Sequence, residues 1–123
     1  IASSIDAAAR CPLGAGAGAG TMANIDRVDL CKTIGFREVI WSTFYATGSR
    51  LDVSWVAAAA ALSLVEMSRI ASDIIMLSSP YTGLFRVPES HVATSSIMPH
   101  KRNPVTLEVL RARGARAAGL LAA

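Results

Sequence analysis

The groups in this chain that could carry out chemistry are concentrated in residues 94–104. Hydroxyls stand at Ser95 and Ser96, an amide stands at Asn103, and the cation of Lys101 has a second cation beside it. Cations together with amides bind carboxylates, and hydroxyls beside them can add hydrogen bonds. This combination indicates a site for a carboxylate or a phosphate.

A helix is expected to begin directly after this stretch. Pro104 suits the first helical position, where its missing N–H would be unpaired anyway, and Asn103 could cap the helix. The apolar-periodic run Val105–Leu110 follows at once. The N-terminus of a helix attracts anions through its unpaired N–H groups and its dipole, and Lys101 and Arg102 add full positive charge. The sequence therefore predicts an anion site on a loop that leads into a helix.

Two segments carry a resemblance to a known enzyme family. The order Ser-Ser-x-Met-Pro-x-Lys-x-Asn-Pro, from Ser95 to Pro104, resembles the signature loop of the fumarase/aspartase superfamily. The segment Cys11–Thr21 resembles the P-L-G-x-G-A-x-A-G-T segment of its argininosuccinate lyase branch, with Gly18 in place of a bulkier apolar residue. The resemblance covers the whole chain. It implies that residues 1–123 form one central helical-bundle domain of a longer enzyme, a fragment without its flanking domains.

The resemblance also implies a reaction and the residues that perform it. The reaction would be β-elimination of argininosuccinate to arginine and fumarate, with neither a cofactor nor a metal. Ser95 would be the catalytic base, and Ser96, Lys101 and Asn103 would bind the anionic succinyl-type substrate. The general-acid histidine of the family belongs to an upstream segment that we do not find in this chain. In the family, long helices form the central bundle of a homotetramer, and each active site draws on three subunits.

Departures from the family pattern keep other interpretations open. His100 stands where argininosuccinate lyases more often carry glutamine and adenylosuccinate lyases often carry histidine. In the family motif D-A-x-S-x-R-D, only Ala46 and Arg50 match well, while Tyr45 stands at the place of the first acid and Gly48 at that of the serine. The alternatives are adenylosuccinate lyase, another aspartate-derived C–N lyase, and a non-catalytic structural or oligomerisation relative.

Composition and charge narrow the class of protein. The chain has 123 residues, which suits one domain, and its 52% hydrophobic content argues against disorder. The net charge is +3, but the basic residues do not form a patch interleaved with aromatic residues. No nucleic-acid partner is therefore expected. Cys11 and Cys31 lack metal-ligand spacing and are expected to be reduced thiols of a cytoplasmic protein, with a disulfide between them left open.

Neither a membrane segment nor a signal peptide is expected. The longest apolar run, Val53–Val65, is shorter than the roughly 18 residues that a membrane-spanning helix needs. The first residues lack the basic region of a signal peptide. The chain begins without methionine and both of its ends read as helix, which supports the interpretation as a fragment.

The apolar periodicity predicts an all-α fold that positions the loop. Helices are expected at residues 1–10, 25–34, about 49–79, and from 104 onward. The helix at 25–34 is expected to be capped by Thr21 or Asn24, with Asp26 in its first turn and Gly35 after its end. Residues 36–47 are expected to form a loop or a short helix, although Val39–Tyr45 has strand propensity. A chain this small should leave part of the long helix exposed as apolar surface.

Overall fold

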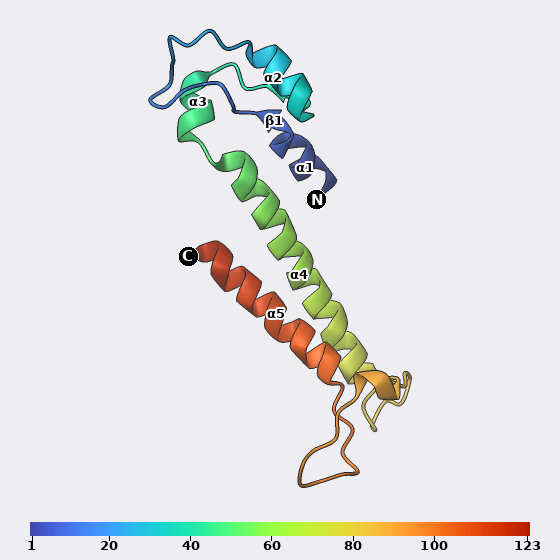
Figure 1. The fold of residues 1–123 in the computed structure, drawn as a ribbon. Helices are drawn as coiled ribbons and strands as arrows, with labels where there is room; N and C mark the ends of the chain where they lie inside the picture. The colour runs from blue at the N-terminus through green and yellow to red at the C-terminus, as the bar shows by residue number, and fades with distance from the viewer. The chain divides into compact units, whose positions relative to one another are not determined.

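The computed structural model describes all of residues 1–123 and is mostly helical (Figure 1). The elements in order are α1 (Ala2–Ala8), β1 (Arg10–Cys11), α2 (Arg27–Ile34), β2 (Glu38–Val39), α3 (Thr43–Gly48), α4 (Leu51–Leu77), the 3-10 helix η1 (Glu89–His91) and α5 (Val105–Ala122). The predicted all-α class is confirmed, with one two-stranded parallel sheet added.

The chain forms two compact units, Ile1–Ala59 and Ala60–Ala123, and α4 begins in the first unit and ends in the second. The helix expected at about residues 49–79 is found at residues 51–77. It starts later than expected because Ser49 is the C-cap residue of α3. The prediction that residues 1–123 form a single central domain stays a prediction.

The sheet of the first unit corrects two expectations. Arg10 pairs with Glu38 and Cys11 with Val39, so α1 ends at Ala8 rather than at Arg10. Residues 36–47 contain the strand β2 in addition to most of α3, which is the expected short helix. The strand propensity of Val39 is realised because β1 offers its backbone groups to this segment, a contact between residues far apart in sequence.

A small core lies under this sheet. Cys11, Cys31 and Val39 are buried together, and Phe36 packs against them. Both cysteines are free thiols, and burial raises the pKa of Cys31, as does its neighbour Cys11 to a smaller degree. A raised thiol pKa keeps Cys31 in the unreactive, protonated form at neutral pH.

The glycine-rich segment after Pro12 contains glycines with positive φ angles. Gly16 has a φ of 73°, and a side chain there would meet the carbonyl oxygen of Gly20 at 2.5 Å. Only glycine combines a positive φ with room for so close a backbone approach. Nothing lies within 4 Å of a side chain built at Gly18, the position where the family usually has a larger residue.

Helix α2 begins differently from the expectation. Asp26 is its N-cap residue rather than part of its first turn, and neither Thr21 nor Asn24 caps it. The Asp26 carboxylate accepts hydrogen bonds from the backbone N–H groups of Val28 (2.9 Å) and Asp29 (3.0 Å). These bonds, that from Asp29 foremost, lower the pKa of Asp26. At the other end, Gly35 has the expected left-handed conformation with a φ of 87°.

Replacing Asp26 with alanine is expected to lower the stability of the first unit at neutral pH. Because the folded-state pKa of Asp26 is lowered, its contribution is present above the ordinary value of 3.8 and is lost as the pH falls through the folded-state value. The difference in thermal unfolding midpoint between wild type and Asp26→Ala should therefore shrink with acidification. Asp26→Asn is the control, because its amide oxygen can still cap the helix without titrating. A difference between wild type and Asp26→Ala that does not change with pH would contradict this account.

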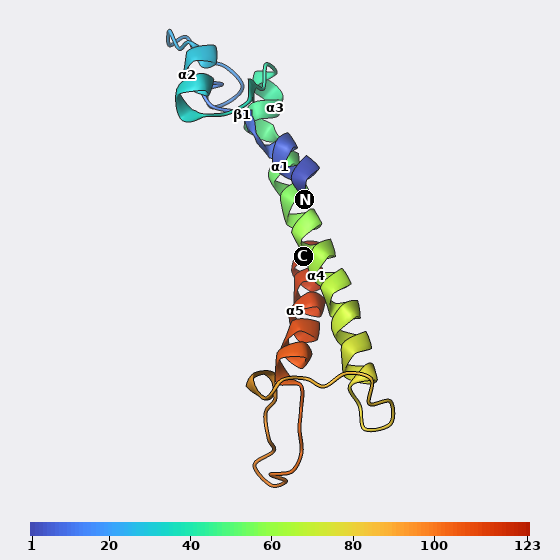
Figure 2. The same cartoon turned by 90° about the vertical axis from the view of Figure 1, so that its right-hand side faces the viewer.

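In the second unit, α5 runs antiparallel to the adjoining part of α4, and the two helices lie side by side in both views (Figures 1 and 2). The two helices approach each other closely at Gly114, which is buried against Ser68 and the carbonyl oxygen of Leu64. Small residues of α4, Ala61 and Ala71, are buried as well. The side of α4 that packs in this unit is therefore its small-residue side.

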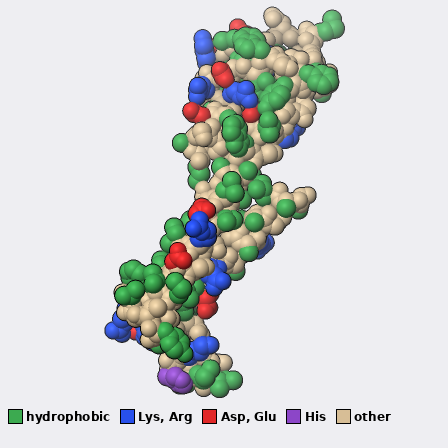
Figure 3. Space-filling model, turned by 180° about the vertical axis from the view of Figure 1, so that it is seen from behind, with side chains coloured by type: hydrophobic (Ala, Val, Ile, Leu, Met, Phe, Trp, Pro, Cys, Tyr) green, Lys and Arg blue, Asp and Glu red, His purple; other side chains and the backbone are tan.

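Several large apolar residues of α4 remain exposed, whereas others, such as Leu64 and Ile74, are half-buried. Leu62 and Ile70 are 63% and 58% exposed. Figure 3 shows hydrophobic side chains on the surface of both units, as expected for a chain too small to cover its long helix. By length and composition alone, α4 is also apolar enough to cross a membrane, which corrects the estimate from Val53–Val65. The core helices of soluble proteins pass the same test, so this is weak evidence for a membrane span.

Replacing Gly114 with alanine is expected to loosen the contact between α4 and α5. The new Cβ would lie 2.8 Å from Ser68 Cβ and 2.9 Å from the Leu64 oxygen, so the helices must separate. Overpacking of this kind costs about 1–3 kcal/mol of unfolding free energy, measurable by denaturant unfolding.

Gly119 of the same helix provides the matched control. Nothing lies within 4 Å of a side chain built there, so Gly119→Ala should stabilise α5 by roughly 0.5–1 kcal/mol through helix propensity. Equal stabilisation by the two substitutions would show that the helices do not approach as described.

Candidate functional site

The loop that carries the predicted site residues is closed at its base by the backbone. Ala93 and Asn103 form an antiparallel bridge in which each N–H donates to the carbonyl oxygen of the other, both at 2.9 Å. Residues 94–102 lie between them, and this loop (orange in Figure 1) extends away from the adjoining ends of α4 and α5. The bridge therefore places the two serines on one side of the loop base and the two cations near the other.

Ser95 is half-buried, whereas its neighbour Ser96 is exposed. The Ser95 hydroxyl oxygen accepts a hydrogen bond of 3.3 Å from the backbone N–H of Ile97. An N–H donor stabilises negative charge on the oxygen that it contacts, which is what a serine base needs. The hydroxyl hydrogen has no acceptor in the protein.

The two remaining predicted substrate-binding residues lie at the end of the loop. The Lys101 side chain is exposed and its ammonium forms no ion pair, while its backbone N–H donates to the carbonyl oxygen of Met98 at 3.0 Å. The Asn103 side chain is half-buried, and its backbone is held by the bridge. No hydrogen bond joins the side chains of Ser95, Lys101 and Asn103, so a ligand would have to bring them together.

Helix α5 starts at Val105, one residue later than the start at Pro104 that the sequence predicted. Pro104 occupies the N-cap position, and no side chain caps the helix. The Asn103 amide is therefore not used as a cap, which leaves it available for another partner. Val105 N–H donates to the Asn103 carbonyl oxygen at 2.8 Å, so the chain turns sharply into the helix.

Sequence reasoning missed the charged residue that contacts this loop from outside. Glu89, at the start of η1, accepts a hydrogen bond from the Arg102 guanidinium, and Arg86 lies 3.7 Å from the same carboxylate oxygen. His91 at the end of η1 contacts the Thr106 hydroxyl through Nδ1 at 3.2 Å. A separation of 13 residues between Glu89 and Arg102 gives no periodic signal. His100 is exposed on the loop.

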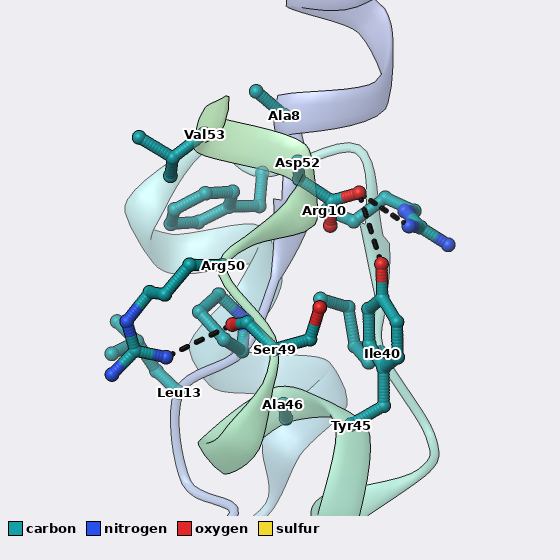
Figure 4. Close-up of a pocket in the computed structure, with 12 residues that line it drawn as sticks. Ala8, Arg10, Leu13, Ile40, Tyr45, Ala46, Ser49, Arg50, Asp52 and Val53 are labelled. Atoms are coloured by element: carbon teal, nitrogen blue, oxygen red, sulfur yellow. Dashed lines mark hydrogen bonds and ion pairs between the residues drawn. The ribbon is translucent and has the colours of Figure 1, made fainter. Parts of the chain in front are cut away.

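A second polar cluster lines a cavity of about 500 Å³ in the first unit (Figure 4). Arg10 donates to Asp52 at 2.8 Å, and the Tyr45 hydroxyl donates to the same oxygen at 3.3 Å. The guanidinium also lies over the Tyr45 ring, 5.7 Å from its centroid. The pKa of Arg10 is raised, chiefly by its hydrogen bond to Asp52. Tyr45, which stands at the acid position of the family motif, thus contacts an acid supplied by α4.

Arg10 and Asp52 balance each other's charge in this cluster. Arg50, which also lines the cavity, donates to the carbonyl oxygens of Ser49 at 2.9 Å and Thr47 at 3.3 Å. These contacts fasten β1, α3 and the start of α4 together and account for the local structure. The structure contains no group of three or more His, Cys, Asp and Glu side chains that could hold a metal ion.

Comparison with known proteins adds independent information. A family model described as lyase matches residues 1–119. The argininosuccinate lyase of Pyrobaculum islandicum is 52% identical over 114 residues, which are 93% of this chain and 27% of that protein. The argininosuccinate lyase of Pyrococcus furiosus is 41% identical over 111 residues, 90% of this chain and 24% of that protein. The chain thus spans about a quarter of the length of these relatives.

Solved structures of lyases share the fold. EDDS lyase in complex with formate superposes with a TM-score of 0.94 at 31% identity, covering 98% of this chain and 24% of that one. A double variant of EDDS lyase with bound fumarate gives the same values. The fold and the sequence therefore point to the same group of enzymes.

Proposed function

This chain belongs to the lyase family, within the fumarase/aspartase superfamily, and we propose that the complete protein containing it cleaves argininosuccinate to arginine and fumarate. The observation that carries the proposal is the identity of 41–53% with argininosuccinate lyases over most of the chain. The loop of residues 94–102 supports it, because it contains Ser95, Ser96 and Lys101, to which the proposal assigns the base and substrate-binding roles.

The proposed reaction breaks the C–N bond β to a carboxylate. Ser95, as its alkoxide, removes the proton from the carbon next to that carboxylate, and the Ile97 N–H helps to stabilise the alkoxide. The electron pair first resides on the carboxylate as an aci-dianion and then forms the double bond of fumarate as the C–N bond breaks. The leaving nitrogen takes its proton from an acid outside residues 1–123.

Lys101 and Asn103 would hold the carboxylate on which this charge develops. A lysine ammonium without an ion pair of its own is available to an incoming anion, and so is the Asn103 amide, which does not cap α5. Electrostatic stabilisation of a developing oxyanion is usually the largest single contribution to catalysis of such reactions. Ser96 would add a hydroxyl at the exposed side of the loop.

The substrate alternatives differ in the amine that leaves. Tyr45 stands where the family motif has an acid, and its hydrogen bond to Asp52 gives it a structural role there. The difference at this position is therefore a weaker reason for preferring another substrate. His100 still supports adenylosuccinate, and the likeness to EDDS lyase supports other succinyl amines. A non-catalytic oligomerisation protein of the same fold is the alternative of a different class.

The proposed function is tested with the purified complete protein and a panel of succinyl amines. Fumarate release is followed by its ultraviolet absorbance, with argininosuccinate, adenylosuccinate and EDDS compared at equal concentration. Argininosuccinate should give the highest kcat/KM. Turnover of another substrate alone would replace the proposal by that alternative, and no turnover of any would favour the non-catalytic relative.

We also propose that the complete protein is a cytoplasmic homotetramer built through its long helices. The exposed Leu62, Met67 and Ile70 of α4 support this, because apolar side chains left uncovered on a long helix offer a surface to another helix. Sedimentation of the complete protein as a monomer at micromolar concentration would contradict the tetramer.

A further inference from the structure

We propose that Glu89 is a positioning residue for the loop of residues 94–102, which it holds through its ion pair to Arg102 so that Lys101 remains the free cation. This inference rests on the proposed function, because Lys101 is assigned there to the substrate carboxylate. It adds a residue outside the loop that determines which of two adjacent cations meets the substrate.

The contact itself is direct and charge-assisted. The Arg102 guanidinium donates to Glu89 Oε1, and the Arg102 side chain is 43% exposed. Arg86 lies 3.7 Å from the same oxygen but its side chain is 86% exposed. Of the two arginines near Glu89, the one in the loop is therefore held closer and covered more.

The ion pair is one of three connections between the segment around η1 and the segment that enters α5. The backbone bridge between Ala93 and Asn103 is the second. The contact of His91 Nδ1 with the Thr106 hydroxyl is the third. Together these connections hold both ends of the loop. Of the three, only the Glu89–Arg102 ion pair involves the side chain of a residue next to Lys101.

This arrangement distinguishes two cations that are neighbours in sequence. An arginine fork matches a carboxylate in a bidentate manner, and a free Arg102 would compete with Lys101 for the carboxylate of the substrate. Glu89 accepts a hydrogen bond from Nη1 of Arg102 and so pairs its charge within the protein. Lys101, which has no partner in the protein, is then the cation that meets the substrate.

The expected effect is modest, because exposed ion pairs contribute little. Loss of the pair lowers the fraction of protein whose loop is ordered for binding, and the apparent dissociation constant rises in inverse proportion to that fraction. Glu89→Gln should therefore raise KM about threefold to fivefold, with kcat near the wild-type value. Removal of the catalytic base would instead lower kcat.

The test uses the complete protein and three variants. Glu89→Gln removes the charge, and the exchange Glu89→Arg with Arg102→Glu reverses the pair. Arg86→Gln is the matched control, because Arg86 is near Glu89 but lies outside the loop. Two readouts are taken: the kcat and KM for argininosuccinate, and the hydrogen-exchange rates of the Ala93 and Asn103 amides.

The expected result is a raised KM and faster exchange at both amides in Glu89→Gln, wild-type behaviour in Arg86→Gln, and recovery of both readouts to within about twofold in the charge exchange. Wild-type KM and exchange in Glu89→Gln would overturn the proposal. An effect of Arg86→Gln equal to that of Glu89→Gln would also overturn it. So would a charge-exchange variant whose KM and amide exchange rates do not return toward the wild-type values. If the wild-type protein does not cleave argininosuccinate, only the proposed function fails, and the exchange rates still decide whether Glu89 holds the loop.

Discussion

Replacing Ser95 with alanine in the complete protein is expected to lower kcat for fumarate release by about 10²–10⁴-fold, the usual loss for a general base. The substitution removes one oxygen from a half-buried position whose only hydrogen bond in the protein is the one accepted from Ile97. Folding and substrate affinity should therefore remain close to wild type. The measurement is kcat from fumarate absorbance, with substrate affinity determined separately by calorimetry.

Ser96→Ala is the matched control for this prediction. Ser96 has the same side chain one position further along the same loop, and it is exposed, so losing a single hydrogen-bond donor should have a milder effect. If Ser96→Ala abolishes turnover while Ser95→Ala retains it, the two roles are exchanged. If both variants keep the wild-type rate, the loop is not catalytic and the structural alternative is favoured.

Replacing Lys101 with methionine should impair both binding and turnover, lowering kcat/KM by about 10²–10³-fold, as for loss of an oxyanion-stabilising group. Methionine keeps much of the length of the side chain and removes its charge. Because Lys101 forms no ion pair within the protein, its loss should leave the unfolding midpoint almost unchanged. A rise in KM together with a fall in kcat would show that the ammonium contacts both the ground state and the transition state.

Lys32→Met provides the control for charge. Lys32 is the other lysine of the chain, it is exposed in the last turn of α2, and its substitution changes the net charge by the same amount. It should leave kcat and KM near wild type. A comparable loss in both variants would mean that the general positive charge of the protein attracts the substrate, and Lys101 would lose its assigned role.

The candidate site could be predicted from sequence to the extent that it is contiguous. Ser95, Ser96, Lys101 and Asn103 stand within one short segment, so their order alone indicated a shared loop. The helix after that loop was predicted because a proline and an apolar-periodic run follow. The order of residues could not show which hydrogen bonds each side chain makes. The Asn103 amide, for example, does not cap α5, because Pro104 is the N-cap residue.

Two of the departures from expectation involve contacts between residues distant in sequence. Asp52 accepts a hydrogen bond from Arg10 across 42 positions, and the same carboxylate oxygen accepts one from Tyr45, which gives the tyrosine a partner at position 45. The pairing of β1 with β2 ended α1 early and made a strand of Glu38–Val39. Neither contact leaves a periodic pattern in the sequence.

The sequence by itself determined the helical class, the position of the long helix and the identity of the loop. Helix formation depends on hydrogen bonds between residues four apart and on local propensity, so a short window of sequence contains the relevant information. The tertiary structure alone decided that Glu89 pairs with Arg102 while Lys101 has no ion pair, and that α4 and α5 approach each other closely at Gly114. Such contacts depend on the distance at which two separate elements approach, and that distance is a property of the folded chain.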